Sequence, residues 1–83
     1  MDWRQVVAAN LRRIRRERGF SQETLAYEAD VNRTYISKLE KGSTWVGLEV
    51  LVKISKVLQA EPADFLERPT RRAVKRPSQP LVK

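Results

Sequence analysis

Cysteine and histidine are both absent from this chain of 83 residues. Without them it can form neither a disulfide nor the usual sets of zinc ligands. The absence of histidine also removes the side chain that most often performs general acid–base catalysis. The sequence contains no nucleophile paired with a base and no cluster of metal ligands, so we expect neither an enzyme nor a cofactor.

Long hydrophobic runs are also missing. No segment approaches the ~20 apolar residues that a membrane-spanning helix needs. Asp2 and Arg4 open an amphipathic pattern and not the apolar stretch of a signal peptide. We therefore expect a cytoplasmic protein with no membrane partner and no small-molecule ligand. A chain of this length forms one small domain with a limited core, which can depend on a partner subunit for stability.

The net charge of +7 is distributed unevenly along the chain. Residues 1–41 carry nine Lys or Arg and six acidic residues, and residues 42–67 carry two and four. Residues 68–83 carry six basic residues, no acidic ones and three prolines. This composition predicts a folded domain over 1–67 and a disordered basic tail over 68–83. The tail fits a solubilising end and a phosphate-contacting segment equally well.

Apolar residues at helical spacing predict helices over residues 3–18, 22–29, 33–41 and 48–58, and a short fifth helix that begins at Pro62. With no strand pattern, the fold class is all-α. The buried faces of the first and fourth helices are predicted to be Trp3, Val7, Leu11 and Ile14, and Leu48, Leu51, Ile54 and Leu58.

Capping residues set the expected helix ends. Asp2, Ser21 and Asn32 stand where N-caps are needed, and Gly19 and Gly42 stand where helices should stop. The second and third helices are short and are separated by a tight turn, which fits a helix-turn-helix. A generic helical bundle fits the same pattern.

The third helix carries hydrogen-bonding side chains on one face. Because Ile36 and Leu39 should face the core, the outward positions are Arg33, Thr34, Ser37 and Lys38. An arginine there is able to donate two hydrogen bonds to guanine in the major groove of DNA. The same side chains also fit an ordinary solvated helix surface.

The sequence resembles the phage-repressor and Cro-type helix-turn-helix family, often called the XRE family, over about residues 6–66. The segments that carry the resemblance are residues 11–15, 19–26 and 35–42, followed by Leu48, Leu51, Lys53, Ile54 and Leu58. The block from Asn32 to Ser37 is also similar to the recognition helix of restriction–modification controller proteins.

This resemblance implies a five-helix bundle of the lambda-repressor-like type and a sequence-specific, DNA-binding transcriptional regulator. By match to the family, Arg33, Thr34 and Lys38, with Ser37 beside them, read DNA bases. The residues expected to contact phosphates are Gln22, Asn32, Tyr35, Lys41 and Thr44. Arg15 and Glu40 match an ion pair between the first and third helices of the family.

The sequence departs from the family pattern at two places. Asp30 stands in the turn, where the family often has glycine. Trp45, Val46 and Gly47 replace the Asn-Pro-Ser that commonly precedes the fourth helix. Trp45 and Val46 are thus two large apolar residues in a segment that is normally polar.

An apolar surface is the remaining signal. Val46, Val50 and Val57 share one face of the fourth helix region, beside Trp45 and with Phe65 farther along the chain. We expect a homodimer interface there, which would place two recognition helices on a palindromic operator in double-stranded DNA. Scattered valines and a tryptophan folded over the core are the alternative. A protein-binding antitoxin or adaptor with the same fold is the rival function.

Overall fold

The computed structural model describes residues 2–68 and contains helices without strands over that range. The elements are α1 (Trp3–Glu17), α2 (Gln22–Ala29), α3 (Arg33–Lys41), α4 (Leu48–Leu58) and a 3-10 helix, η1 (Pro62–Leu66). The predicted all-α fold class is confirmed. The expected basic tail lies almost wholly outside the described residues, so its division from the folded domain stays a prediction.

The predicted fifth helix is a 3-10 helix, so the described chain has four α-helices and not five. The element is only five residues long, from Pro62 to Leu66, and isolated runs this short commonly adopt the tighter 3-10 form. A reciprocal capping box between Glu61 and Asp64 closes its first turn. One turn is enough to bring Phe65 into the core.

Three side-chain caps fix where the first three helices begin. The Asp2 carboxylate accepts a hydrogen bond from the backbone N–H of Arg4. The Ser21 hydroxyl accepts one from Thr24, and the Asn32 side-chain oxygen accepts one from the N–H of Thr34 at 2.7 Å. Each cap satisfies an N–H group that has no partner inside the helix.

Left-handed residues end the helices. Gly19 and Gly42 have φ angles of 78° and 75°, which glycine adopts without steric cost. Asp30 and Gln59 take the same conformation at 57° and 55°, although each has a Cβ atom. The turn between α2 and α3 therefore has the geometry that a glycine commonly supplies, with an aspartate in its place.

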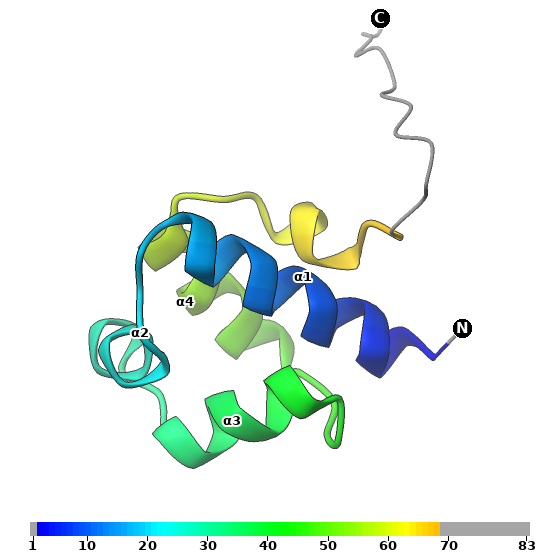
Figure 1. Ribbon diagram of the computed structural model, residues 1–83, viewed down its shortest axis with the longest axis horizontal. Helices are drawn as coiled ribbons and strands as arrows, with labels where there is room; N and C mark the ends of the chain where they lie inside the picture. The colour runs from blue at the N-terminus through cyan, green and yellow to red at the C-terminus, as the bar shows by residue number, and fades with distance from the viewer. Residues whose placement is uncertain (1, 69–83) are drawn as a thin grey trace, which may run out of the picture.

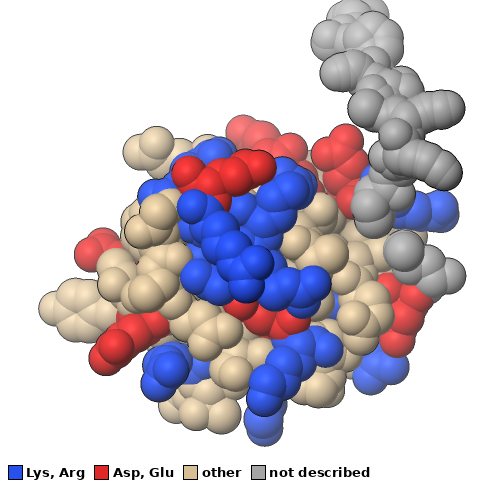
Figure 2. All heavy atoms as spheres, viewed as in Figure 1, with Lys and Arg blue, Asp and Glu red and all other residues tan. Residues whose placement is uncertain are grey.

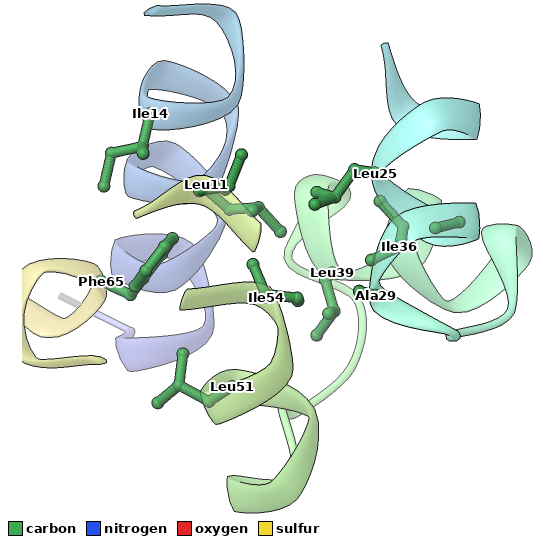
Figure 3. Packing of buried hydrophobic residues seen from close by; sticks show 11 residues of the cluster. Leu11, Ile14, Leu25, Ala29, Ile36, Leu39, Leu51, Ile54 and Phe65 are labelled. Carbon is green, nitrogen blue, oxygen red and sulfur yellow. The ribbon is translucent and has the colours of Figure 1, made fainter. Parts of the chain in front are cut away.

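The helices wrap around one core (Figure 1). The long α1 crosses one side of the molecule and packs on α3 and η1, while α2 packs on α3 and α4. The apolar side chains from all five elements converge between them, as Figure 3 shows for Leu11, Leu25, Ile36, Ile54 and Phe65. The helix-turn-helix unit, α2 with α3, is thus held against α1 and α4 through its buried face.

Two residues predicted for the buried faces are exposed instead. Trp3 is 43% exposed and Leu48 is 75% exposed. Each is the first residue of its helix, beyond the region where neighbouring helices cover the apolar face. The remaining predicted positions, Val7, Leu11, Ile14, Leu51, Ile54 and Leu58, are buried.

Polar side chains fasten the later elements to α1. The buried Asn10 amide donates to the backbone oxygens of Phe65 at 3.0 Å and Glu67 at 2.9 Å. The Arg18 guanidinium donates to the Leu58 carbonyl at 2.7 Å, at the end of α4 where carbonyls lack helical partners.

Within residues 2–68, no helix is long and apolar enough to cross a membrane.

Candidate DNA interface

The outer face of α3 is polar and accessible. Arg33, Thr34 and Lys38 are exposed and Ser37 is half-buried, whereas Ile36 and Leu39 are buried on the opposite side. No ion pair within residues 2–68 engages Arg33 or Lys38. Their hydrogen-bond donors are therefore available to a ligand, as major-groove recognition of base edges requires.

A buried ion pair joins α3 to α1. Arg15 donates to both carboxylate oxygens of Glu40, with 2.9 Å between Nη2 and Oε1. The Glu40 side chain is only 4% exposed. The third nitrogen of Arg15 donates to the Phe20 carbonyl at 2.8 Å, so the whole guanidinium fork is used. These are the two positions that the family resemblance pairs.

Two further side chains bond Glu40, one at its carboxylate and one at its backbone carbonyl. The Gln22 amide nitrogen donates to Oε1 at 3.0 Å, and Arg12 donates to the Glu40 backbone carbonyl. Burial would raise the pKa of the Glu40 carboxyl, but the hydrogen bonds from Arg15 and Gln22 and the charges of Arg15 and Arg12 hold it below its usual value. The carboxylate is therefore ionised at neutral pH and fixes α1, α2 and α3 together.

The residues predicted to contact phosphates do not share one environment. Asn32 and Lys41 are exposed at the two ends of α3, and Thr44 is half-buried in the loop before α4. Gln22 is half-buried at the first turn of α2, with one amide hydrogen directed to Glu40. Its amide has a second hydrogen, which leaves one donor for another acceptor.

Tyr35 differs from the other predicted phosphate contacts. Its hydroxyl donates to the Trp45 carbonyl at 2.9 Å and accepts from the Gly47 N–H at 3.0 Å. Its ring packs against the core. The hydroxyl is therefore directed to the loop before α4.

Basic side chains are concentrated on the side of the molecule shown in Figure 2, over α1 and below it toward α3. Some of those on α1 have internal partners. The Arg13 Nη1 atom lies 3.5 Å from the Glu17 Oε2 atom. Arg12, and Arg18 directly after the helix, donate to backbone carbonyls. Arg16 is exposed and enters no ion pair within the described part of the chain. The sequence alone could not separate these structural arginines from free ones.

The predicted interface residues are only partly accessible. Phe65 is 1% exposed and belongs to the core, so its side chain cannot contact a partner, contrary to prediction. Val50 and Val57 are half-buried and also pack against the core. Trp45, in contrast, is 63% exposed, with Val46 half-buried beside it.

An apolar groove of about 420 Å³ surrounds Trp45 and Val46. Its lining residues are Trp3, Val7, Trp45, Val46, Leu48, Leu51 and Leu66. The Arg4 guanidinium lies over the Trp45 ring, 5.4 Å from its centroid, and Arg68 lies over Trp3 at 5.3 Å. Sequence reasoning placed Trp3 and Leu48 in the core and missed this groove, although the apolar Trp45–Val46 departure beside Leu48 signalled it.

Comparison with known proteins identifies the family. A helix-turn-helix family model matches residues 11–65, which spans most of the described domain. The chain belongs to the XRE-type family of helix-turn-helix, DNA-binding transcriptional regulators. The family resemblance inferred from the sequence is thus confirmed.

Individual relatives of this helix-turn-helix regulator agree. It is 43% identical to control protein C.BamHI of Bacillus amyloliquefaciens over 77% of this chain and 80% of that protein. The restriction-modification controller protein C.AhdI from Aeromonas hydrophila matches with a TM-score of 0.72 and 32% identity, over 75% of this chain and 94% of the other. A hypothetical transcription factor from Neisseria matches with a TM-score of 0.79 and 34% identity, over 86% and 80%. These names are those of regulators, which is consistent with the expectation that the chain is not an enzyme.

Proposed function

We propose that this helix-turn-helix regulator binds double-stranded DNA as a homodimer and selects its operator through α3. Arg33, Thr34 and Lys38, with Ser37 beside them, would contact base edges in the major groove. The observation that carries this proposal is the exposed polar face of α3, held by the buried Arg15–Glu40 pair. A rigidly placed guanidinium is suited to the two acceptors of guanine.

Phosphate contacts would set the position of α3 in the groove. We assign them to Gln22, Asn32, Lys41 and Thr44, which lie at the N-terminus of α2, at the two ends of α3 and in the loop that follows. The free N–H groups of the first turn of α2 favour an anion beside Gln22. Such contacts orient the protein and make its affinity depend on salt, without selecting a sequence.

The apolar groove supports pairing of two copies. Trp45, Leu48 and Leu66 are exposed apolar side chains on one surface, and aromatic anchors of this kind commonly dominate the energy of an interface. A two-fold dimer would place two α3 helices ~34 Å apart, one helical turn of DNA. The operator would then be a palindrome.

The names of the relatives suggest where such a regulator acts. C.AhdI is a restriction-modification controller protein, and we propose a similar controlling role for this chain. Repression would follow from blocking RNA polymerase at the operator, and activation from contacting it. We expect this regulation to take place in the cytoplasm, where RNA polymerase would meet the operator.

Selection of bound sites from random DNA tests the proposal. We expect an enriched palindrome whose affinity falls steeply as salt rises. Arg33→Ala should reduce affinity by about tenfold or more and relax the sequence preference at one position in each half-site. Lys56→Ala, a change at an exposed basic residue of α4, serves as the control and should leave the selected sequence unchanged.

The outcomes separate the proposal from its rival. A pool that remains random would contradict sequence-specific binding and favour a protein-binding role for the same fold. An enriched sequence without two-fold symmetry would contradict the homodimer while keeping the DNA contact.

A further inference from the structure

The two tryptophans of the chain both line the apolar groove, and each has an arginine over its ring. Arg4 lies 5.4 Å from the centroid of Trp45, and Arg68 lies 5.3 Å from that of Trp3. Trp45 is the more exposed of the two and stands in a loop, whereas Trp3 belongs to α1. Few neighbours restrain so exposed a side chain, so the guanidinium over its ring is a main restraint on its orientation.

Hydrogen bonds fix the backbone of the Trp45 loop but not its indole ring. The Tyr35 hydroxyl donates to the Trp45 carbonyl at 2.9 Å and accepts from the Gly47 N–H at 3.0 Å. Neither bond restrains the side-chain torsions that turn the indole. The direction in which Trp45 points from the groove therefore depends on contacts with the ring itself, and Arg4 makes one of them.

Asp2 holds the Arg4 guanidinium in place. Its carboxylate accepts from Arg4 Nη2 at 3.0 Å and from Nε at 3.4 Å, and it also caps α1 through the Arg4 backbone N–H. The side-chain and backbone hydrogen bonds from Arg4 lower the pKa of the Asp2 carboxyl, so it is ionised at neutral pH. A guanidinium with its own counter-charge is covered by an apolar partner at lower cost than a lone charge.

The contact between Arg4 and Trp45 would be worth more in a pair of chains than in a single one. A cation–π contact strengthens when water is removed from around it. In the single chain, Trp45 is 63% exposed and the Arg4 side chain 38%, and a partner that covers the groove would exclude that water. A ring that is already held in place also loses less freedom on binding.

The charges at the border of the groove fit a second copy of the chain. Glu49, with a side chain that is 84% exposed, follows the groove residue Leu48, and the exposed Glu67 follows Leu66. Together with the guanidiniums over the two tryptophans, the border carries both signs of charge. Such a border is able to pair with itself about a two-fold axis, because each sign on one copy can meet the opposite sign on the other.

We propose that Arg4, oriented by Asp2, is a positioning residue of the pairing surface and holds the Trp45 indole ready for a second copy of the chain. The inference rests on the proposed homodimer. In a two-fold pair the contact occurs twice, once in each copy. Its effect on the stability of the pair is therefore doubled.

Arg4→Gln tests the proposal because it removes the guanidinium and keeps a polar side chain. In the absence of DNA, we expect the dimer dissociation constant measured by sedimentation equilibrium to rise about tenfold, as two cation–π contacts are lost. Arg4→Lys keeps the positive charge and should restore part of the loss. Arg16→Gln, at an exposed arginine of the same helix, is the matched control. An unchanged dissociation constant for Arg4→Gln would overturn the proposal.

Asp2→Asn separates the two roles of Asp2. Asparagine caps a helix about as well as aspartate does, but it is not a counter-charge for Arg4. The thermal midpoint of the dilute monomer should change little, while the dimer dissociation constant should rise as it does in Arg4→Gln. If the dissociation constant stayed at the wild-type value, Asp2 would only cap α1 and its part in the proposal would be refuted.

The fluorescence of Trp45 distinguishes failure of this inference from failure of the homodimer. Trp3→Phe leaves Trp45 as the only tryptophan of the chain. In dilute protein with this change, Arg4→Gln should increase the quenching of Trp45 by acrylamide, whereas Arg16→Gln should not. Unchanged quenching would overturn the positioning role. Increased quenching, together with a wild type that stays monomeric at high concentration, would instead overturn the homodimer and with it the role of Arg4 in pairing.

Discussion

At the scale of single residues, Glu40 is the centre of a buried polar cluster that joins α1, α2 and α3. Its carboxylate is buried and receives donors from Arg15 and Gln22, and its backbone carbonyl receives one from Arg12. A buried charge without a partner is unfavourable, so the two charges of the pair depend on each other. The position of α3 relative to α1 follows from this cluster.

Glu40→Ala should lower the free energy of unfolding by about 3–5 kcal/mol, because it leaves the Arg15 guanidinium buried without its counter-charge. Chemical denaturation of the wild type and the variant measures the difference. Glu23→Ala, at an exposed glutamate of α2, should change stability much less. Equal stability of Glu40→Ala and the wild type would show that the pair does not hold the fold.

The same carboxylate predicts a dependence on pH. The folded-state pKa of Glu40 lies below its usual value, so its contribution to stability is fully present above the unfolded pKa of about 4.3 and is lost as pH falls through the folded pKa. The stability difference between the wild type and Glu40→Gln should therefore be constant above about pH 5 and shrink below about pH 4. Urea unfolding across that range measures it. A difference that grows on acidification would contradict the lowered pKa.

At the scale of elements, the helix ends show how closely local signals determine this chain. The caps at Asp2, Ser21 and Asn32 form as the sequence predicts. The ends at Asp30 and Gln59 show the opposite case, because a left-handed backbone is imposed on residues that disfavour it. Asparagine and aspartate tolerate this conformation better than glutamine does.

Gln59→Gly should raise the free energy of unfolding by up to about 1 kcal/mol, because glycine adopts the left-handed conformation without the steric cost of a Cβ atom. Asp30→Gly should give a smaller gain. Thermal unfolding of both variants compares the two positions. A loss of stability in Gln59→Gly would mean that the entropy of the glycine in the unfolded chain outweighs the relief at the helix end.

Element positions were therefore predictable, but the accessibility of particular residues was not. Helical spacing identifies an apolar face, and it correctly placed Leu11, Ile54 and Leu58. It does not show where along that face the neighbouring helices stop, so it placed Trp3 and Leu48 in the core. The hydrogen bonds of Tyr35 join α3 to the loop 10 and 12 residues later, which spacing cannot reveal.

At the scale of the whole molecule, the polar face of α3 and the apolar groove form two surfaces on one small domain. The residues that we propose to read DNA follow from the family pattern and from the outward face of α3. The groove combines residues of α1, the loop before α4, α4 itself and η1. Only the folded chain brings these segments together, so the groove could not be derived from any one of them.

Leu48→Ala should weaken the dimer by about 1–3 kcal/mol, because Leu48 is 75% exposed at the groove and its truncation removes apolar contact with a partner. Sedimentation velocity over a range of concentrations measures the monomer and dimer populations. The thermal midpoint of the dilute monomer, measured by thermal unfolding, should change little. Val52→Ala, at another exposed apolar position of α4, is the control for surface truncation.

If two copies pair through the apolar groove, as we propose, the groove also sets how the protein responds to its own abundance. In the dilute range, mass action makes the concentration of a pair vary as the square of the concentration of single chains. A cell that makes twice as much of this chain would then hold about four times as much of the form that occupies a palindrome. The exposed tryptophan and leucines of one small surface would thereby turn a gradual accumulation of protein into a sharp onset of regulation.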